Sequence, residues 1–279
     1  MEQAGYTCIG HCEIDRFADK SYRAMHSPGE DEWFESDITK VMPGDLPEAD
    51  VYCGGFPCQA FSNIGKRGGF EDTRGTLFFE VMRLAKERKP KLLFLENVAG
   101  LLTHNGGKTF ATILNTLGEL GYWYEYQVLN SKYFGVPQNR ARVFIIGHLG
   151  EYNGRTVFPI GESYQTPTDL QGDQPYVSTI LAGDKQYSYI VEGEWISKNP
   201  TELRWIDHDV LAALLRKRRI RKLTARELFR LQGFPDEHFE RAHQINSINQ
   251  LYKQIGNSVT VPVIYQIAKE LERITSADG

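Results

Sequence analysis

Short runs of apolar and β-branched residues alternate, over the first 150 residues, with longer stretches in which apolar residues recur every three or four positions. The short runs predict strands and the longer stretches predict helices. Strands are expected at residues 6–12, 33–38, 50–54, 92–95, 124–129 and 142–147, and helices at 16–25, 77–88 and 110–120. This alternation favours an α/β fold built on a parallel, doubly wound sheet.

The pattern changes between residues 151 and 219, where Gly, Pro, Thr, Asp and Tyr are frequent and only residues 210–218 predict a helix. Regularity returns at Thr224, which forms a helix-capping sequence with Glu227, three residues later. A last helix is expected at 263–274. We therefore predict a main domain at 1–150, a smaller irregular domain at 151–219, and a return to the main domain at 220–279.

The chain has 279 residues, of which 41% are hydrophobic, and a formal net charge of -4. This balance argues against a generally cationic nucleic-acid binder. Its four cysteines are too few for a disulfide scaffold, and it shows neither a membrane-length apolar run nor a secretory leader pattern. We therefore expect a soluble, reduced, cytoplasmic protein with no membrane partner.

Charge is unevenly distributed along the chain. Residues 1–50 carry twelve acidic and four basic side chains, whereas residues 216–226 carry seven basic side chains and no acidic one. A basic run of this kind is either a solvated helix face or a contact surface for phosphates.

Two candidate chemical groups follow predicted strands. Cys58 comes soon after the strand at 50–54, and Glu96 comes directly after the strand at 92–95. Since ligands bind at the carboxyl ends of parallel strands, a thiol and a carboxyl group could converge there. Taken alone, Cys58 could equally be a buried structural thiol, and Glu96 a salt-bridge or capping residue.

Five short motifs identify a family when they are taken together: Gly-Phe-Pro-Cys-Gln at 55–59, Asp-Thr-Arg-Gly-Thr-Leu at 72–77, Glu-Asn-Val at 96–98, Gln-Asn-Arg-Ala-Arg at 138–142, and Gly-Asn-Ser-Val at 256–259. In this order and spacing the set resembles the bacterial cytosine-C5 DNA methyltransferases. The resemblance implies a Rossmann-like class I methyltransferase fold, with a separate target-recognition domain at 151–219.

The resemblance also implies catalytic roles. Cys58 occupies the position of the nucleophile that adds to cytosine C6, and Glu96 that of the acid at the base's N3 and amino group. Arg142 is similar to the arginine that contacts the base and steadies this carboxylate. Arg140 is the fourth expected catalytic-site residue and resembles an arginine that orders the backbone around the site.

The family's methyl donor is S-adenosylmethionine, with S-adenosylhomocysteine as product, and no metal. Glu13 corresponds to the carboxylate that binds the ribose hydroxyls, and Asp37 with Ile38 to the pair that contacts the adenine. The remaining donor-site positions that match are Ile14, Pro57, Leu77, Asn257, Ser258 and Val259. A metal site formed by the cysteines is not expected, because neither Cys8 with Cys12 nor Cys53 with Cys58 has a matching second pair.

The implied macromolecular partner is double-stranded DNA, from which the target cytosine must be flipped out. Residues 59–72 resemble the loop that closes over the target base in the family. The implied DNA contacts are Gln59, Ser62, Lys66, Arg67, Arg74 and Thr179. A monomer is expected, with a cognate restriction endonuclease as a further partner.

The chain departs from the family pattern at its start. Family members begin with a central strand and a Gly-rich loop, whereas residues 1–6 of this sequence align with the end of the helix that follows them. Unpaired edges on the two neighbouring strands are therefore expected. Three explanations stay open: a truncated chain, a piece supplied by another chain, and a degenerate copy.

Two other functions also stay open. One is an RNA cytosine-5 methyltransferase of the tRNA-methylating branch, against which the bacterial-type loop and the size of region 151–219 argue. The other is a non-catalytic DNA-binding remnant, suggested by the missing donor loop.

Overall fold

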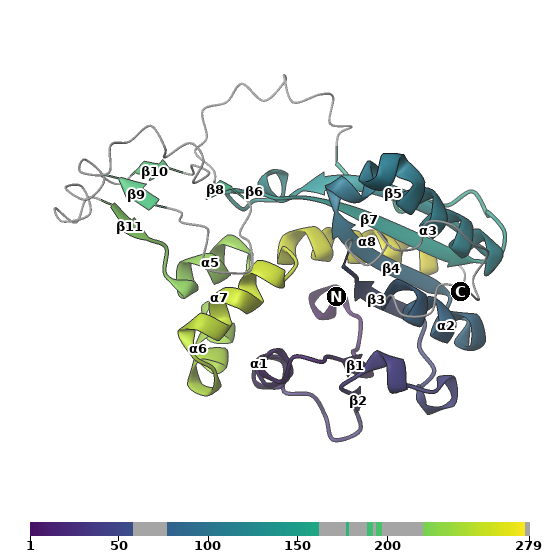
Figure 1. Cartoon of the computed structure of the whole chain (residues 1–279), viewed down its shortest axis with the longest axis horizontal. Helices are drawn as coiled ribbons and strands as arrows, with labels where there is room; N and C mark the ends of the chain where they lie inside the picture. Colours follow the sequence, from purple (N-terminus) through teal and green to yellow (C-terminus); the bar gives the residue numbers. More distant parts are fainter. Residues whose placement is uncertain (58–76, 162–176, 179–188, 192–193, 197–219, 277–279) are drawn as a thin grey trace.

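The computed structural model describes residues 1–57, 77–161, 177–178, 189–191, 194–196 and 220–276 (Figure 1). The α-helices are α1 (Arg16–His26), α2 (Leu77–Arg88), α3 (Lys108–Glu119), α5 (Ala225–Leu231), α6 (Asp236–Ile245), α7 (Ile248–Asn257) and α8 (Val261–Thr275). The strands are β1 (Gly10–Cys12), β2 (Trp33–Glu35), β3 (Val51–Gly55), β4 (Leu92–Val98), β5 (Tyr122–Asn130), β6 (Gln138–Asn139), β7 (Ala141–Leu149), β8 (Val177–Ser178), β9 (Tyr189–Val191), β10 (Glu194–Ile196) and β11 (Ile220–Lys222). Short 3-10 helices are η1 (Glu2–Ala4), η2 (Ile38–Lys40), η3 (Pro43–Asp45), η6 (Ala99–Leu102), η7 (His104–Gly107) and η8 (Ser131–Tyr133).

The larger sheet has the strand order β3-β4-β7-β5. β3 and β4 are parallel, but β7 runs antiparallel to both of its neighbours. The prediction of a wholly parallel sheet is therefore wrong for strand β7. The physical reason is the short connection: only residues 131–140 join β5 to β7, and a parallel crossover needs a dozen residues or more.

A second, separate sheet consists of β1 and β2, which pair in parallel from Gly10 with Trp33 to Cys12 with Glu35. Figure 1 shows this pair apart from the larger sheet, on the side of β3. Within the described residues β1 pairs only with β2, and β3 only with β4. β1 begins later than expected, because residues 2–4 form η1 and Gly5 turns the chain with a φ of 90°.

Both faces of the larger sheet are buried, and β4 shows how. Leu93 and Leu95 pack with α2 and α3, whereas Leu92 and Phe94 point to the opposite face and pack with α8. Alternate residues of a strand face opposite sides of a sheet, so a strand covered on both sides needs a continuous apolar run. The run Leu-Leu-Phe-Leu meets this need and ends at Glu96.

Helices α5, α6 and α7 form a third apolar cluster around Phe229, Phe239 and Leu251. α5 begins at the predicted cap, where Thr224 and Glu227 form reciprocal hydrogen bonds. α6 and α7 were not predicted from the sequence. The predicted helix at 210–218 lies outside the described residues, and no described helix is long and apolar enough to span a membrane.

Candidate active site

The site is built where β3 and β4 end side by side. Gly55 pairs directly with Glu96. A Cβ atom on Gly55 would lie 3.3 Å from Glu96 Oε2, closer than most real contacts of this kind. The glycine therefore leaves room for the carboxylate beside the backbone that leads to Cys58.

Asn97 holds the segment that follows β3. Its buried side chain donates a hydrogen bond from Nδ2 to the carbonyl of Phe56, at 2.6 Å, and accepts one from the Val98 N–H at 2.9 Å. Pro57 is the last described residue before Cys58, which lies outside the described residues. No role was expected for Asn97, although an amide that follows an apolar run and a carboxyl group within one motif was a usable signal.

Arg142 comes to Glu96 from the antiparallel strand β7. The two side chains form an ion pair of 2.9 Å between Arg142 Nε and Glu96 Oε1, and are 14% and 20% exposed. This is the contact that the resemblance implied for Arg142. A pair that is largely removed from water is screened less than a surface pair.

Burial sets the protonation of this cluster. It raises the pKa of Glu96, an effect that the neighbouring Arg142 and, to a lesser extent, Arg140 oppose. Burial also lowers the pKa of Arg142, and together with the charge of Arg142 it lowers the pKa of Arg140 to about 10. Glu96 is therefore a carboxyl group poised to exchange a proton.

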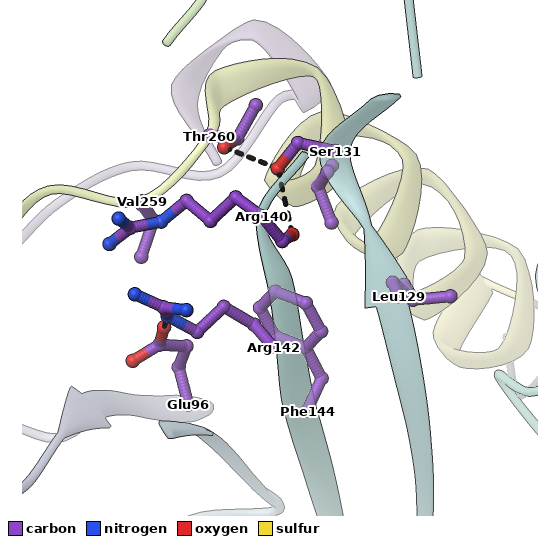
Figure 2. A pocket seen from close by; sticks show the side chains of 9 residues that line it. Glu96, Leu129, Ser131, Arg140, Arg142, Phe144, Val259 and Thr260 are labelled. Atoms are coloured by element: carbon purple, nitrogen blue, oxygen red, sulfur yellow. Dashed lines mark hydrogen bonds and ion pairs between the residues drawn. The ribbon is translucent and has the colours of Figure 1, made fainter. Parts of the chain in front are cut away.

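Arg140 is buried and points toward the loop between α7 and α8 (Figure 2). Its guanidinium donates hydrogen bonds to the carbonyls of Gly256, at 3.2 Å, and Ser258, at 2.8 Å. These contacts agree with its expected role in ordering the backbone. They connect the Gln-x-Arg-x-Arg motif to the Gly-Asn-Ser-Val motif.

The hollow beside these arginines is too narrow for a water molecule. Its lining residues come from strands β4, β5 and β7, from the β5–β7 connection and from the start of α8: Glu96, Leu129, Ser131, Arg140, Arg142, Phe144, Val259, Thr260 and Val263 (Figure 2). The polar groups around this narrow hollow hold one another in place.

The predicted donor residues lie at the ends of β1 and β2. Glu13 follows β1 and accepts a hydrogen bond from the Asp15 N–H, at 2.7 Å. Asp37 follows β2 and accepts hydrogen bonds from the N–H and hydroxyl of Thr39, which lower the pKa of Asp37. Since β1 and β2 are adjacent and parallel, both carboxylates lie at the same edge of this sheet.

Helix α7 spans the two groups of predicted residues. Near its middle, Lys253 forms an ion pair of 2.6 Å with Asp15, two residues after Glu13. At its end, Gly256 and Ser258 meet Arg140. The predicted donor residues Asn257, Ser258 and Val259 therefore lie at the end of a helix that contacts both the β1 edge and the arginine cluster.

Of the other predicted donor residues, three are exposed and one is partly buried. Ile14 is 77% exposed beside Glu13, and Leu77 is 42% exposed at the start of α2. Ile38 is partly buried, and its carbonyl accepts a hydrogen bond from Arg83 of α2 at 3.2 Å. Pro57 is exposed after the buried Phe56. Exposed apolar side chains next to carboxylates can take the apolar faces of a nucleoside.

The predicted DNA contacts Gln59, Ser62, Lys66, Arg67, Arg74 and Thr179 all lie outside the described residues. Of the basic stretch at 216–226, the side chain of Arg226 is described. It forms ion pairs with Glu240 and Asp236 and lies over the ring of Phe239. Arg226 therefore links α5 to α6, and the other basic side chains of this stretch lie outside the described ones.

The described residues contain no group of three or more His, Cys, Asp or Glu side chains that could hold a metal ion.

Comparison with known proteins identifies the family. The model of the C-5 cytosine-specific DNA methylases matches residues 1–202 and 162–273. The chain is 38% identical to the Type II methyltransferase M1.ScrFI of Lactococcus lactis subsp. cremoris, over 93% of this chain and 70% of that protein. It is 36% identical to the Type II methyltransferase M.HpaII of Haemophilus parainfluenzae, over 97% of this chain and 84% of that protein.

The fold is also similar to that of solved structures. The Dnmt2 methyltransferase of S. pombe superposes with a TM-score of 0.66 at 19% identity, over 98% of this chain and 94% of that one. Entamoeba histolytica methyltransferase EhMeth gives a TM-score of 0.64 at 20% identity, over 95% and 89% of the two chains. These similarities confirm the expected Rossmann-like methyltransferase fold, and the sequence matches establish that the chain belongs to the C-5 cytosine-specific DNA methylase family.

Proposed function

We propose that this DNA (cytosine-5-)-methyltransferase uses Cys58 as a covalent nucleophile and transfers a methyl group from S-adenosylmethionine to a cytosine flipped out of double-stranded DNA. The observation that carries the proposal is the pairing of Gly55 with Glu96. It puts the backbone that leads into Cys58 next to a buried carboxyl group, which is itself paired with Arg142.

The chemistry requires both groups. Carbon 5 of cytosine is a poor nucleophile, so the Cys58 thiolate first forms a bond to C6. The electron pair displaced from the C5–C6 bond is stabilised when N3 takes a proton, and C5 becomes nucleophilic. After C5 is methylated its proton leaves as a base removes it, the C5–C6 double bond forms again, and the Cys58 thiolate departs.

Glu96 is the group suited to the proton at N3. Burial raises the pKa of its carboxyl, which favours the protonated form that donates to a ring nitrogen. Arg142 acts in the opposite direction and keeps the carboxylate accessible for the return of the proton. Its ion pair with Glu96 also fixes the direction in which the carboxyl points.

The donor edge fits a nucleoside with two hydroxyls. Glu13 uses one oxygen for the Asp15 N–H, and in this proposal its other oxygen accepts from the ribose. Asp37 and Ile38 would bind the adenine, with Ile14, Pro57, Leu77, Asn257, Ser258 and Val259 completing the site. When bound, S-adenosylmethionine supplies an electrophilic methyl group.

The DNA side of the proposal follows from the family resemblance. Gln59, Ser62, Lys66, Arg67, Arg74 and Thr179 would contact the DNA. Residues 151–219 would select the target sequence, between catalytic parts at 1–150 and 220–279. We further propose a monomer that works in the bacterial cytoplasm beside a cognate restriction endonuclease.

The two alternatives are less well supported. Relatives at 36% and 38% identity are described as Type II methyltransferases of a DNA methylase family, which favours DNA over tRNA as substrate. A non-catalytic remnant would not need Glu96 in this position, since an unused carboxyl group that is largely removed from water only costs stability.

Covalent trapping tests the proposal. The chain is incubated with S-adenosylmethionine and a DNA duplex containing 5-fluorocytosine, whose fluorine cannot leave as the C5 proton does. An adduct that survives denaturation is expected, and it should disappear in Cys58→Ala. Cys53→Ala is the matched control, because it removes a thiol from β3 and should leave the adduct intact. An undiminished adduct in Cys58→Ala would sink the assignment of the nucleophile.

A further inference from the structure

A buried polar network lies behind the arginine cluster. Three of its side chains are at most 4% exposed, and they come from three separate parts of the chain: Ser131, Gln232 and Thr260. Gln138 is buried as well and bonds to the backbone next to Gln232. Gln138 donates from Nε2 to the Leu231 carbonyl, at 3.0 Å, which ties β6 to the end of α5. Polar groups so deeply buried are costly unless they are hydrogen-bonded.

The hydroxyl protons of this network can be assigned by counting donors. Gln232 donates from Nε2 to the Ile255 carbonyl, at 3.2 Å, so its Oε1 is the atom that faces Thr260. Thr260 has one hydroxyl proton and donates it to this oxygen, at 2.7 Å. Its own oxygen, 2.7 Å from that of Ser131, then accepts from Ser131, whose hydroxyl has the Arg140 carbonyl as a second, more distant acceptor at 3.3 Å. The chain runs from Ser131 through Thr260 to Gln232.

Ser131 and Thr260 belong to a ring of contacts that includes Arg140; Figure 2 shows its Thr260–Ser131–Arg140 part. The Ser131 N–H donates to the Arg140 carbonyl at 3.0 Å, which holds the backbone of the arginine. Ser131 then bonds to Thr260, two residues beyond Ser258, whose carbonyl accepts from the Arg140 guanidinium at 2.8 Å. The backbone carbonyl and the guanidinium group of Arg140 are thereby held in a fixed relation to each other.

The ring is anchored to the rest of the molecule by Gln232. Its carbonyl accepts a hydrogen bond from the Val261 N–H at 2.8 Å, beside the side-chain contact with Thr260. Gly233, the next residue, has a φ of 82°, and a Cβ atom there would lie 2.5 Å from Pro262. The end of α5 and the start of α8 are therefore in tight contact, with little freedom to shift.

We propose that Thr260 is a positioning residue for the methyl-transfer reaction: its hydroxyl closes the ring that holds Arg140, and with it the neighbouring Arg142, in the geometry that serves Glu96. The inference rests on the proposed function and adds a residue that touches neither base nor donor. An apolar side chain would fill the same space, but it would leave the Gln232 oxygen unpaired and the ring open.

The test compares three variants of the whole chain. Thr260→Val keeps the shape of the side chain and removes the hydroxyl, whereas Thr260→Ser keeps the hydroxyl. Thr116→Val is the matched control, since Thr116 is a buried threonine of α3 that donates to the Thr112 carbonyl, away from the arginines. Amide hydrogen exchange at Ser131 is measured for each variant, together with kcat and the KM for DNA and for donor.

In Thr260→Val the Ser131 amide should exchange faster and kcat should fall by about 10- to 100-fold, with the donor KM changed by less than about 2-fold. Thr260→Ser should restore both properties, and Thr116→Val should change neither. Unchanged exchange in Thr260→Val, or an equal loss of kcat in Thr116→Val, would overturn the positioning role. A wild-type chain that forms no 5-methylcytosine would instead count against the proposed function, whatever the exchange rates are.

Discussion

The two edges that carry the candidate site differ in how firmly their polar groups are held. At the end of β4, Glu96 is ion-paired with Arg142, and Arg140 is bound to two backbone carbonyls. At the ends of β1 and β2, the Glu13 and Asp37 carboxylates bond, among the described residues, only to groups two positions along the chain or, for Asp37, to nearby Lys40. The β4 edge is built before a substrate arrives, and the donor edge is left accessible.

The difference has a chemical reason. Groups that stabilise charge on a reacting ring work best when they are fixed and dry beforehand. Groups that bind a soluble cofactor must exchange water for ligand in every turnover, so they need exposed acceptors. Changes at the β4 edge should therefore affect the reaction step, and changes at the donor edge should affect cofactor affinity.

The largest effect is expected from Glu96→Gln. The amide cannot deliver a proton to N3, so kcat should fall by about 10²- to 10⁴-fold. DNA affinity should stay nearly unchanged, because the side chain is buried and its charge is neutralised by Arg142. Methyl-transfer rates give kcat, and a binding titration gives the affinity for DNA. A parallel loss of both would contradict the role of Glu96.

Gly233→Ala should destabilise the fold by roughly 2–3 kcal/mol, because it combines a positive φ with a clash against Pro262. Chemical denaturation measures the loss. Gly118→Ala is the control, since Gly118 lies in α3 and a Cβ there meets nothing within 4 Å. Gly233→Ala as stable as the wild type would show that the contact between α5 and α8 is loose.

The pH dependence of the Arg142→Met variant should show the effect of the Arg142 charge on Glu96, because methionine keeps an unbranched side chain without the charge. In the wild type, burial raises the pKa of Glu96, and the step that needs the protonated carboxyl slows as pH rises through that pKa. Arg142 lowers the pKa of Glu96, so its removal should move this limb of the profile to higher pH, at a reduced maximal rate. A limb that moves to lower pH would contradict the electrostatic account.

The same substitution has a consequence for stability. The folded protein binds the Glu96 proton more tightly than the unfolded chain does, so ionisation of Glu96 destabilises the fold as pH rises from the unfolded pKa through the folded one. Without Arg142 this loss should be larger. Denaturation of both proteins at about pH 5 and about pH 8 measures it, and equal pH dependence would argue against the coupling.

At the donor edge, Glu13→Gln should weaken S-adenosylmethionine binding by about 10-fold, the effect of one charge-assisted hydrogen bond. The amide oxygen can still accept from the Asp15 N–H, so stability should not change. Calorimetric titration with the cofactor measures the affinity. Glu2→Gln is the control, because Glu2 lies in η1 and contacts His26.

The smallest effect is expected outside both edges. Thr224→Ala removes the helix cap of α5 and should cost about 1 kcal/mol of stability. Thr224→Ser should retain most of it. Methylation kinetics at moderate temperature should be the same in all three proteins, and an altered kcat would mean that α5 influences the reaction through more than its folding.

The sequence predicted local structure where one pattern dominates. The helix at 77–88 begins and ends as predicted, because its apolar spacing and the proline at position 90 agree. α6 escaped prediction because its apolar positions are few, with Phe239 and Ala242 as its buried residues. The antiparallel direction of β7 depends on chain connection, which the strand's own apolar pattern does not encode.

The candidate site shows the same limit. Glu96 and Arg142 could be predicted because short motifs carry them. The contact between Ser131 and Thr260 joins residues far apart in the sequence, and each is a common residue with no motif value of its own. Only the packing of β5, β7 and α8 makes these hydroxyls neighbours, so no local pattern could have indicated the network.

The most direct test of the account is the chemical identity of the product. The chain is incubated with S-adenosylmethionine carrying an isotopic methyl label and either duplex DNA or tRNA, and the nucleosides are separated by mass spectrometry. The account predicts labelled 5-methyldeoxycytidine from the duplex, which Cys58→Ala abolishes. Label at the exocyclic nitrogen of cytosine, faster labelling of tRNA than of DNA, or no labelled cytosine would contradict it.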